Sequence, residues 1–455
     1  MSTAERAPEL PRSNGISYQE LLDTDTHPVP KILREQSPLD LPPTFVPVER
    51  YVTQEYHDLE MEKLWSRVWQ FACREEEIPE AGDHVVYDIG DFTILIVRNE
   101  KGEINAFHNV CRHRGRQLRE HSGRVSVFRC PFHRWTWNLD GTLAEIPCRW
   151  DFPHVEREKY DLPSVNLGTW GGFVFINLDS DCEPLEDFLG DLPRHFEKWP
   201  LENKYKAAHV ARVMNCNWKV AQEAFMEAYH VIATHPQLTA SIGDANSQYD
   251  VWENFSRAIT PNGTPSPHLN WDPTQQEQLD NLTGRNVDGP PILQLPEGMG
   301  ARELMAQAAR MQMQAVVPGV NEISDAELND SFYYSVFPNF HPWAAFNRIV
   351  YRFRPLGNDP NKSLMECLYL QPFRGRRPKP AEITWLTEND DWTEATELGF
   401  LSRVFNQDTF NLPKVQKGLR ARVAAGGGTA PLANYEEAKI RHFHHLYEKW
   451  LGLST

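Results

Sequence analysis

Two short ligand pairs are the feature that most limits what this chain can be. Cys111 and His113 stand in C-R-H, and sixteen residues later Cys130 and His133 stand in C-P-F-H. Each pair supplies one sulfur and one nitrogen, so two facing loops could hold zinc or an iron–sulfur cluster. Zinc sites with two cysteines and two histidines more often pair Cys with Cys and His with His. The mixed pairs therefore favour a cluster.

The residues around these pairs agree with that interpretation. A Rieske [2Fe–2S] centre needs a mixed set, because two histidines replace two cysteines on one iron. The stretches N-V-C-R-H-R-G and R-C-P-F-H-R-W-T-W-N-L-D-G-T-L resemble the Rieske domain of the ring-hydroxylating oxygenases, large (alpha) subunit type. The resemblance extends over roughly residues 50–420. It implies that Cys111, His113, Cys130 and His133 bind the [2Fe–2S] cluster.

A second motif follows in N-W-K-V-A-Q-E-A-F-M-E-A-Y-H-V-I-A-T-H-P, residues 217–236. The pattern predicts a helix from Trp218 to about Tyr229. His230 and His235 are five residues apart, which is more than one helical turn, so the helix is expected to loosen near Val231 and bring both rings together. Two imidazoles and one carboxylate are the ligands of non-haem Fe(II) oxygenases. Alone this motif is weak evidence. About a hundred residues after a Rieske motif, however, it resembles the family's mononuclear iron site.

The resemblance also implies a third iron ligand, an aspartate in a C-terminal helix with a glutamine several residues later. The segment F-N-Q-D-T-F-N-L-P-K-V-Q-K-G-L, residues 405–419, fits and nominates Asp408. Asp408 has apolar neighbours, where a carboxylate needs a reason to be. The rival carboxylates belong to a charge run typical of a solvated helix start, and they are Asp390, Asp391, Glu394 and Glu397.

Length and composition set further limits. With 455 residues, the chain exceeds what one core usually supports. No apolar run of about 18 residues and no signal-peptide core appear, so we expect a soluble, cytoplasmic protein without a membrane segment. The net charge of −17 argues against nucleic acid as a partner. The cysteines outside the two pairs are expected to be buried or reduced thiols: Cys73, Cys148, Cys182, Cys216 and Cys367.

The order of patterns along the chain predicts an α+β protein in two domains. Residues 1–45 are polar and proline-rich and predict an extended arm. Residues 46–185 predict a small all-β Rieske domain with a lead-in helix and a hairpin turn at Asn99–Gly102. Residues 186–455 predict the catalytic domain, which the resemblance implies is a helix-grip (START-like) fold.

Within that domain, three segments predict adjacent antiparallel strands at 332–339, 344–355 and 363–373. The C-terminal segment R-H-F-H-H-L-Y-E-K-W-L predicts an amphipathic helix. Residues 255–300 are the least regular, and an active-site lid and a tolerated surface insertion are equally compatible with them.

Electron supply is expected to come from another protein. No G-x-G-x-x-G follows a predicted strand, so NAD(P)H should act only through a reductase or ferredoxin. The resemblance implies a trimer, with or without a small β subunit, in which the cluster of one subunit serves the iron of its neighbour. A carboxylate between a cluster histidine and an iron histidine completes that path, and here the position is Glu227.

Two departures from the family pattern stand out. Most relatives have aspartate where Glu227 stands, although the carnitine-oxygenase branch has a similar glutamate. Ala224 stands where many relatives have asparagine, which hints at a more hydrophobic substrate.

The expected function is that of a terminal oxygenase component that uses O2 and relayed electrons to hydroxylate a hydrophobic, aromatic substrate. The alternative is a Rieske monooxygenase that hydroxylates or dealkylates a non-aromatic or quaternary-ammonium compound. Two other classes stay open: an electron carrier that uses only the cluster, and a zinc protein. Arginines near the cluster pairs are candidates for guiding an acidic electron donor, and they are Arg112, Arg114, Arg116, Arg119, Arg129 and Arg134.

Overall fold

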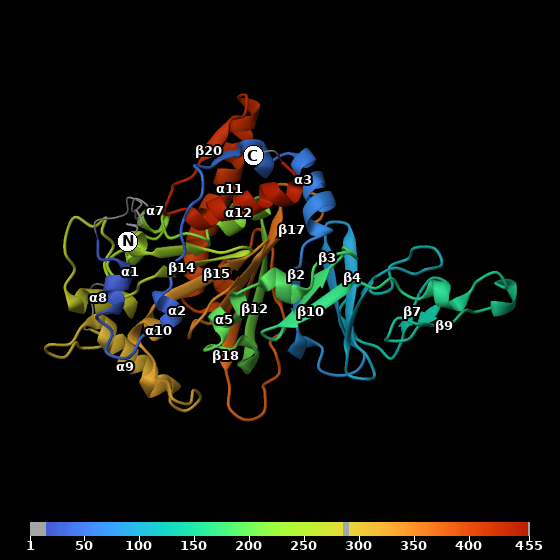
Figure 1. Ribbon diagram of the computed structural model, residues 1–455, viewed down its shortest axis with the longest axis horizontal. Coiled ribbons are helices and arrows are strands. Elements are labelled where there is room, and N and C mark those ends of the chain that lie inside the picture. Colours follow the sequence, from blue (N-terminus) through green and yellow to red (C-terminus); the bar gives the residue numbers. More distant parts are fainter. Residues whose placement is uncertain (1–14, 285–290, 454–455) are drawn as a thin grey trace, which may run out of the picture.

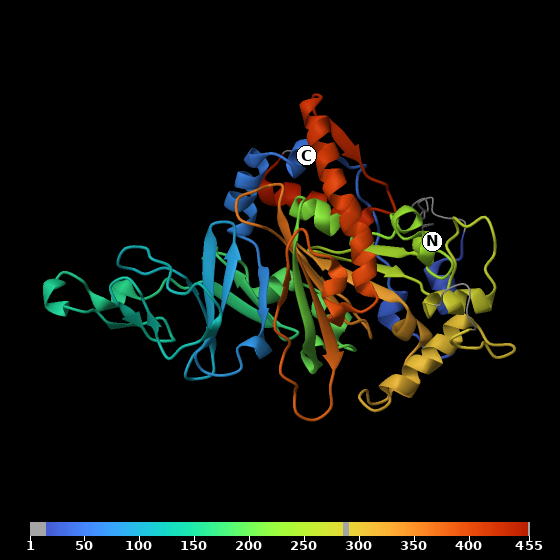
Figure 2. The ribbon, with the colours of Figure 1, turned by 180° about the vertical axis from the view of Figure 1, so that it is seen from behind.

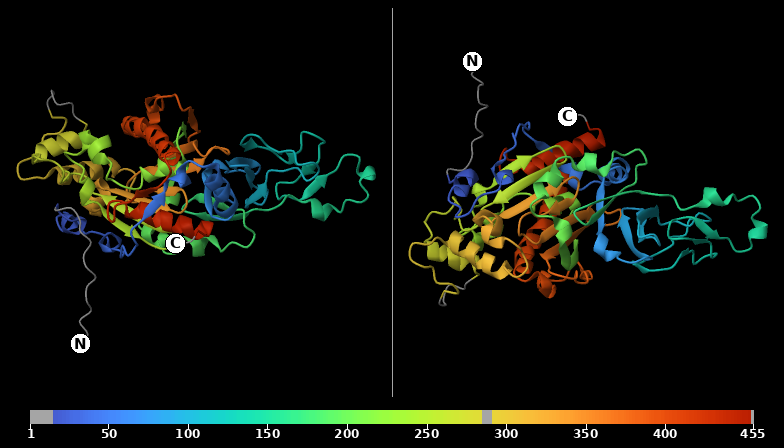
Figure 3. Two further views of the ribbon diagram at one scale, coloured as in Figure 1. Left: turned by 90° about the horizontal axis from the view of Figure 1, so that it is seen from above. Right: turned by 60° about the horizontal axis from the view of Figure 1, so that its bottom comes forward.

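The computed structural model describes residues 15–284 and 291–453. The molecule is elongated, with short strands that carry the two ligand pairs at one end and a large sheet covered by helices at the other (Figure 1). Seen from above, the strands around the ligand pairs project away from the body of the molecule (Figure 3). The end with the ligand pairs is therefore narrow, whereas the end with the large sheet is broad.

Three small antiparallel sheets make up the N-terminal β region in the described part of the chain. One has the order β10-β11-β2, the next β5-β4-β3-β6, and the third β7-β8-β9. The strands are β2 (Gln70–Arg74), β3 (Asp83–Ile89), β4 (Phe92–Arg98), β5 (Ile104–His108), β6 (Gly123–Arg124), β7 (Phe128–Arg129), β8 (Thr136–Trp137), β9 (Leu143–Glu145), β10 (Asn166–Trp170) and β11 (Phe173–Asn177). The hairpin of β4 and β5 turns where the sequence predicted it, at residues 99–102.

The large sheet has the order β13-β14-β15-β16-β17-β18-β12-β19 and is antiparallel except for the β12–β19 pair. Its strands are β12 (Lys204–Met214), β13 (Gln248–Val251), β14 (Phe255–Thr260), β15 (Ser331–Val336), β16 (Phe340–Pro342), β17 (Ile349–Pro355), β18 (Ser363–Pro372) and β19 (Thr384–Leu386). The three strand segments predicted from the sequence are confirmed as β15, β17 and β18, and β16 lies between the first two.

The helices pack around this sheet, and the long helix α11 crosses it in the view from behind (Figure 2). They are α1 (Tyr18–Leu22), α2 (Lys31–Arg34), α3 (Gln54–Glu60), α4 (Leu185–Leu189), α5 (Leu192–Phe196), α6 (Trp218–Glu223), α7 (Val231–Thr234), α8 (Gln275–Leu282), α9 (Ala301–Met313), α10 (Asp325–Asn329), α11 (Leu401–Ala424) and α12 (Ala438–Leu451). The amphipathic C-terminal helix is confirmed as α12. No helix in the described residues is long and apolar enough to cross a membrane.

The two faces of the large sheet have different neighbours. On one face, Tyr351 and Phe353 of β17 pack with Phe405 of α11 in a common apolar cluster. On the other, the Arg352 guanidinium forms a two-point ion pair with Glu366 at 2.6–2.7 Å and donates to the carbonyl oxygens of β2. A buried guanidinium needs hydrogen-bond acceptors for its N–H groups, and here some of those acceptors belong to β2. The contact therefore joins the large sheet to the N-terminal β region.

Two predicted segments differ from the structure. Residues 255–300 are not irregular throughout, since β14 opens the segment and α8 lies within it. Thr274 and Glu277 form a capping box at the start of α8, which explains why a helix begins there. Residues 285–290 of this segment lie outside the described residues.

The arm predicted to be extended also contains α1 and α2 in its described part, from residue 15 onward. Ser17 and Glu20 form a capping box that starts α1. The Tyr18 hydroxyl donates to Asp330, and the backbone amide of Ser37 donates to Asp250. Residues 15–45 of the arm therefore pack against the folded catalytic region.

Candidate metal centres

The first cluster loop is a tight turn closed by its own backbone. The amide of Cys111 donates to the carbonyl of Arg116 at 2.8 Å, and the amide of Gly115 donates back to Cys111 at 2.9 Å. Gly115 has φ 77°, a left-handed conformation that glycine adopts without strain. The turn therefore holds the Cys111 and His113 side chains on one loop with little freedom.

The second cluster loop repeats this backbone pattern. The amide of Cys130 donates to Trp135 at 2.8 Å, and the amide of Arg134 donates to Cys130 at 2.9 Å. Arg134 has φ 69°, the same left-handed conformation, although it is not a glycine. The two loops thus form matching frames that place one cysteine and one histidine each.

The four side chains come together between the loops. The Cys111 and Cys130 thiols are buried, and burial raises the pKa of Cys111, with a further increase from its neighbour Cys130. The rings of His113 and His133 lie 4.7 Å apart between centroids. The Nδ1 atom of His113 is buried and has no hydrogen-bond partner among the described residues. Two thiols, two adjacent imidazoles and an unpaired ring nitrogen suit a [2Fe–2S] group of the Rieske type.

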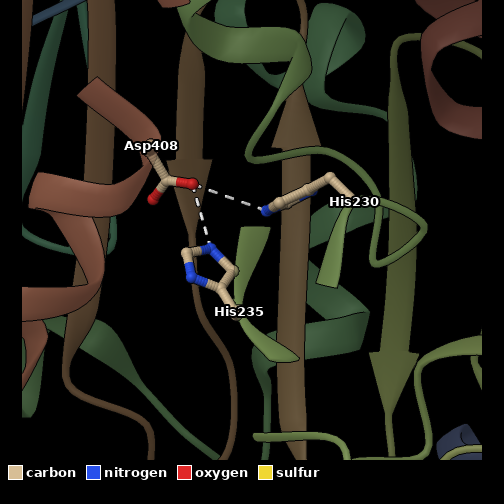
Figure 4. Close-up of side chains that lie close together, drawn as sticks. All are labelled: His230, His235 and Asp408. Carbon is tan, nitrogen blue, oxygen red and sulfur yellow. Dashed lines mark hydrogen bonds and ion pairs between the residues drawn. The ribbon is translucent and has the colours of Figure 1, made fainter. Parts of the chain in front are cut away.

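The second candidate centre joins two distant parts of the chain. His230, His235 and Asp408 bring their ligand atoms within 4.8 Å of one another (Figure 4). The Nε2 atoms lie 3.6 Å (His230) and 3.0 Å (His235) from Oδ1 of Asp408. The side chains of His235 and Asp408 are each 4% exposed, and that of His230 is 25% exposed. Two imidazoles and one carboxylate on one side leave the other side free, which suits a ferrous ion.

Local structure explains the spacing of the two histidines. The helix predicted to reach about Tyr229 ends earlier, since α6 stops at Glu223 and the short α7 lies between His230 and His235. Pro236 follows His235 and disfavours a helical conformation there. His235 accordingly leaves the helix with φ −125° and ψ 50°. The two rings lie 5.1 Å apart between centroids, at an interplanar angle of 70°, because the helix is interrupted on both sides.

Each of these histidines has a partner on its second ring nitrogen. Glu227 contacts Nδ1 of His230 at 2.6 Å and also accepts from its backbone amide at 2.9 Å. Burial opposes the charged form of His230, but the Glu227 and Asp408 carboxylates outweigh it and raise the pKa of His230. Gln407 contacts Nδ1 of His235 at 2.8 Å. The sequence did not single out Gln407, although it directly precedes Asp408.

The rival carboxylates have other tasks. Asp391 caps the turn at Trp392–Glu394, and Glu394 accepts from the amide of Asp391. Asp390 accepts from the amide of Thr387, and Glu397 accepts from the Thr384 hydroxyl. Of these carboxylates, only Asp408 lies with the two histidines, while those at 390–397 bond to nearby turns and to β19.

The triad of His230, His235 and Asp408 lies beside the aromatic cluster of the large sheet. The Tyr351 ring contacts Phe225 at 5.1 Å and Phe405 at 5.8 Å between centroids. Burial raises the pKa of Tyr351 well above its usual value, and the nearby Asp408 carboxylate adds to this. The Trp343 ring lies 6.0 Å from Tyr351, and its indole nitrogen is buried without a partner in the described residues. Half-buried Ala224 packs against the same cluster.

Two family matches agree with this geometry. Residues 191–453 match the family described as ring hydroxylating alpha subunit (catalytic domain), and residues 68–156 match the Rieske [2Fe-2S] domain. The chain therefore belongs to the ring-hydroxylating alpha-subunit family. The two matches imply a Rieske cluster and a mononuclear iron, and they confirm the predicted fold class and cofactors. The ligand assignments and the domain boundaries at 46–185 and 186–455 stay predictions.

Individual relatives have diverse substrates in their names. The chain is 33% identical to the glycine betaine monooxygenase oxygenase subunit of Pseudomonas aeruginosa over 200 residues, 43% of this chain and 46% of that protein. It is 33% identical to the anthranilate 1,2-dioxygenase large subunit of Acinetobacter baylyi over 202 residues, 43% of each. The matched part thus spans about half the length of these curated relatives.

Solved structures extend the likeness in fold. A quaternary ammonium Rieske monooxygenase, CntA, in complex with L-carnitine has a TM-score of 0.62 at 19% identity, over 91% of this chain and 99% of that one. Naphthalene 1,2-dioxygenase with indole bound has a TM-score of 0.63 at 17% identity, over 91% and 94%. At this identity the likeness concerns the fold alone.

Proposed function

We propose that this chain is the terminal oxygenase component of a multicomponent Rieske oxygenase. The observation that carries the proposal is the convergence of His230, His235 and Asp408 within 4.8 Å, in a chain that also has the paired cysteine and histidine loops. An electron carrier needs only the loops, and a zinc protein needs no paired Rieske frames. The combination is what an oxygenase requires.

In this proposal each side chain has a defined task. Cys111, His113, Cys130 and His133 hold the cluster, and His230, His235 and Asp408 hold the iron. When bound, the cluster supplies single electrons and the iron supplies the activation of O2. His235 and Asp408, which are buried, and the aromatic side chains around them would exclude water and hold the substrate. Glu227 orients the His230 ring through Nδ1.

We further propose that the chain acts as a trimer, alone or with a small β subunit. The α7 helix and the β7–β9 strands lie on opposite sides of the molecule, so the loops of one copy cannot serve the triad of the same copy directly (Figure 1). Exposed apolar side chains stand at both ends: Phe132 (55%) and Trp150 (80%) beside the loops, and Tyr229 (53%) and Phe410 (67%) near the triad. Such patches mark protein interfaces.

Charge favours the same contact. Arg112, Arg114 and Arg134 are exposed on the cluster loops. Near the triad, Glu436 lies beside Glu227, and burial together with the Asp244 and Glu227 carboxylates raises the pKa of Glu436 to about 7. A basic loop that docks there would relieve this acidic crowding. In the trimer, Glu227 would then lie between a cluster histidine and His230. Sedimentation of the purified protein should show three copies per particle.

For the substrate, we propose a hydrophobic, aromatic compound. The ring-lined setting of Phe225, Tyr351 and Phe405 supports it, as does the name of anthranilate 1,2-dioxygenase among the relatives. A role in aromatic hydrocarbon catabolism would follow from this substrate class.

A quaternary-ammonium substrate is the second candidate, with hydroxylation or dealkylation as the reaction. Tyr333, Trp343 and Tyr351 form a chain of electron-rich rings at 5.4 and 6.0 Å. Tyrosine and tryptophan faces attract quaternary ammonium groups. The names of the glycine betaine and carnitine monooxygenases among the relatives point the same way.

One experiment separates these candidates. The reconstituted protein, with a compatible ferredoxin and reductase, is given aromatic acids and hydrocarbons in one series and betaines in another. O2 consumption matched mole for mole by an oxygenated product identifies the substrate class. Tyr351→Phe should affect betaines little, since the ring remains, whereas Trp343→Leu should weaken them more than the aromatics. Uncoupled O2 consumption in both series would contradict both candidates.

A further inference from the structure

The two iron-site histidines differ in the chemistry behind their rings. His230 has the Glu227 carboxylate at Nδ1, at 2.6 Å, whereas His235 has the Gln407 amide at Nδ1, at 2.8 Å. Both Nε2 atoms face Asp408. One imidazole of the site is therefore hydrogen-bonded to a carboxylate and the other to a neutral amide.

Gln407 is itself held by a second amide. Its Oε1 atom accepts from Nε2 of Gln237 at 2.7 Å, and its Nε2 atom donates to Oε1 of Gln237 at 3.2 Å. A reciprocal amide pair of this kind fixes the plane of both groups. With Oε1 toward His235, the ring must carry its proton on Nδ1, because an amide oxygen only accepts. Nε2 is then left with a free lone pair toward the triad.

Helix α8 supports this pair from the other side. Nδ2 of Asn281 donates to the backbone carbonyl of Gln237 at 2.6 Å, and the Ser241 hydroxyl donates to Oδ1 of Asn281. Gln237 belongs to the short 3-10 helix Pro236–Leu238 that begins directly after His235. The ring of His235 is thus connected to α11 through Gln407 and to α8 through Gln237.

We propose that Gln407, held by Gln237, is a positioning residue that sets the tautomer and the ring plane of His235 for iron binding. The inference rests on the proposed function, since it assumes that the triad holds iron. A neutral acceptor polarises the imidazole less than a carboxylate does, so His235 is the weaker donor of the pair and His230 the stronger. Without Gln407, the ring of His235 could take the other tautomer and turn its N–H toward the triad.

The test measures metal affinity in the purified, cluster-containing protein. Gln407→Leu keeps the bulk of the side chain but removes the acceptor, and it should weaken Fe(II) binding about 10- to 100-fold in competition with a chelator. Gln407→Glu restores an acceptor and should bind Fe(II) within a few-fold of wild type. Gln237→Leu should have a smaller effect, because Gln407 can still accept from His235.

Controls separate positioning from packing. Asn411→Leu removes another amide contact between α11 and the α7 segment, its 3.3 Å bond to Thr234, without touching a histidine. It should leave Fe(II) affinity unchanged. In protein loaded with Co(II), the visible absorption bands should change in Gln407→Leu and not in Asn411→Leu. The cluster spectrum and the melting temperature should match wild type in all variants.

The outcomes distinguish this inference from the proposed function. If His235→Ala abolishes Fe(II) binding while Gln407→Leu binds as well as wild type, the positioning role is wrong and the iron site stands. Equal losses in Gln407→Leu and Gln407→Glu would also overturn it, since shape rather than hydrogen bonding would then matter. Undiminished Fe(II) binding in His235→Ala would overturn the iron site itself.

Discussion

The cluster loops and the triad of His230, His235 and Asp408 both gather side chains that can bind metals, but they do so in opposite ways. Each cluster loop spans six residues and is closed by its own backbone hydrogen bonds, and the second loop repeats the first. The triad joins residues 173 positions apart, His235 and Asp408, through the packing of α11 on the large sheet. Hydrogen bonds within each short loop position the side chains of the first site, whereas the packing of distant segments positions those of the second.

The difference also concerns exposure. His133 is exposed on its loop, whereas His235 and Asp408 are buried beneath the surface of the catalytic region. In the proposed function, the loops need access to an electron donor and the triad needs protection from water. The two regions should consequently respond independently to mutation.

The largest expected effect is the loss of the cluster. Cys111→Ser or His133→Ala should abolish the red-brown Rieske absorption, because the loops offer no spare ligand at matching spacing. The mononuclear iron should still bind, since α7, between the two histidines of the triad, lies on the opposite side of the molecule from β7 and β9 (Figure 1). Anaerobic absorption spectra and iron analysis measure both. A variant with the full Rieske spectrum would contradict the assignment.

Loss of the iron site comes next. His230→Ala, His235→Ala or Asp408→Ala should remove about one iron per subunit and abolish turnover, because a three-ligand site has no redundancy. The cluster spectrum should survive. Retention of both iron and turnover in Asp408→Ala would move the third ligand to the carboxylates at 390–397. Asp391→Ala is the matched control and should lose only a turn cap.

Glu227 tests whether the two regions communicate. Glu227→Gln should keep cluster and iron but slow the oxidation of the pre-reduced cluster severely in single-turnover measurements. Glu227→Asp should retain partial activity, because a water could fill the gap left by the shorter side chain. Cluster oxidation in Glu227→Gln at the wild-type rate would end the bridging role.

The arginines around the cluster loops should affect encounter more than chemistry. Of the six arginines, Arg116 already pairs with Glu120 within the chain, whereas Arg112, Arg114, Arg129 and Arg134 are exposed. Reduction by an acidic ferredoxin or reductase should slow roughly tenfold as salt is raised, since complementary charge mainly speeds association. Arg114→Gln should weaken this dependence. Rates indifferent to ionic strength count against the idea.

The smallest effect compares the two loops directly. Gly115 and Arg134 occupy the same left-handed position, and no atom lies within 4 Å of a Cβ built at Gly115. Gly115→Ala should therefore lower the free energy of unfolding by up to about 1 kcal/mol, because the strain of a left-handed alanine exceeds the stabilisation from a less free unfolded chain. Arg134→Gly should not lower it, because relief of strain offsets the added freedom of glycine in the unfolded chain. Thermal denaturation of the cluster-containing protein measures both.

The accuracy of the sequence-based predictions follows the same division. The cluster motif, the hairpin at Asn99–Gly102 and the strands around 332–373 depend on neighbours in sequence, and the structure contains them. The helix expected to reach Tyr229 was predicted too long, because packing and the proline after His235 interrupt it. The segment 255–300 was expected to be irregular, yet β14 finds its partners in β13 and β15.

By itself, the sequence supplied two short segments that each offer one cysteine and one histidine, and a third that offers two histidines, since a short segment can place neighbouring side chains in only a few ways. Their assignment to a cluster and an iron came from the family resemblance. Asp408 was reached through family resemblance, not spacing, because a contact across 173 residues depends on how the intervening sheet folds. Only the tertiary structure placed the Gln407 amide at Nδ1 of His235. It also placed the cluster loops far from α7 in the same chain. Such contacts arise from the packing of α11, α8 and the sheet, which no local pattern contains.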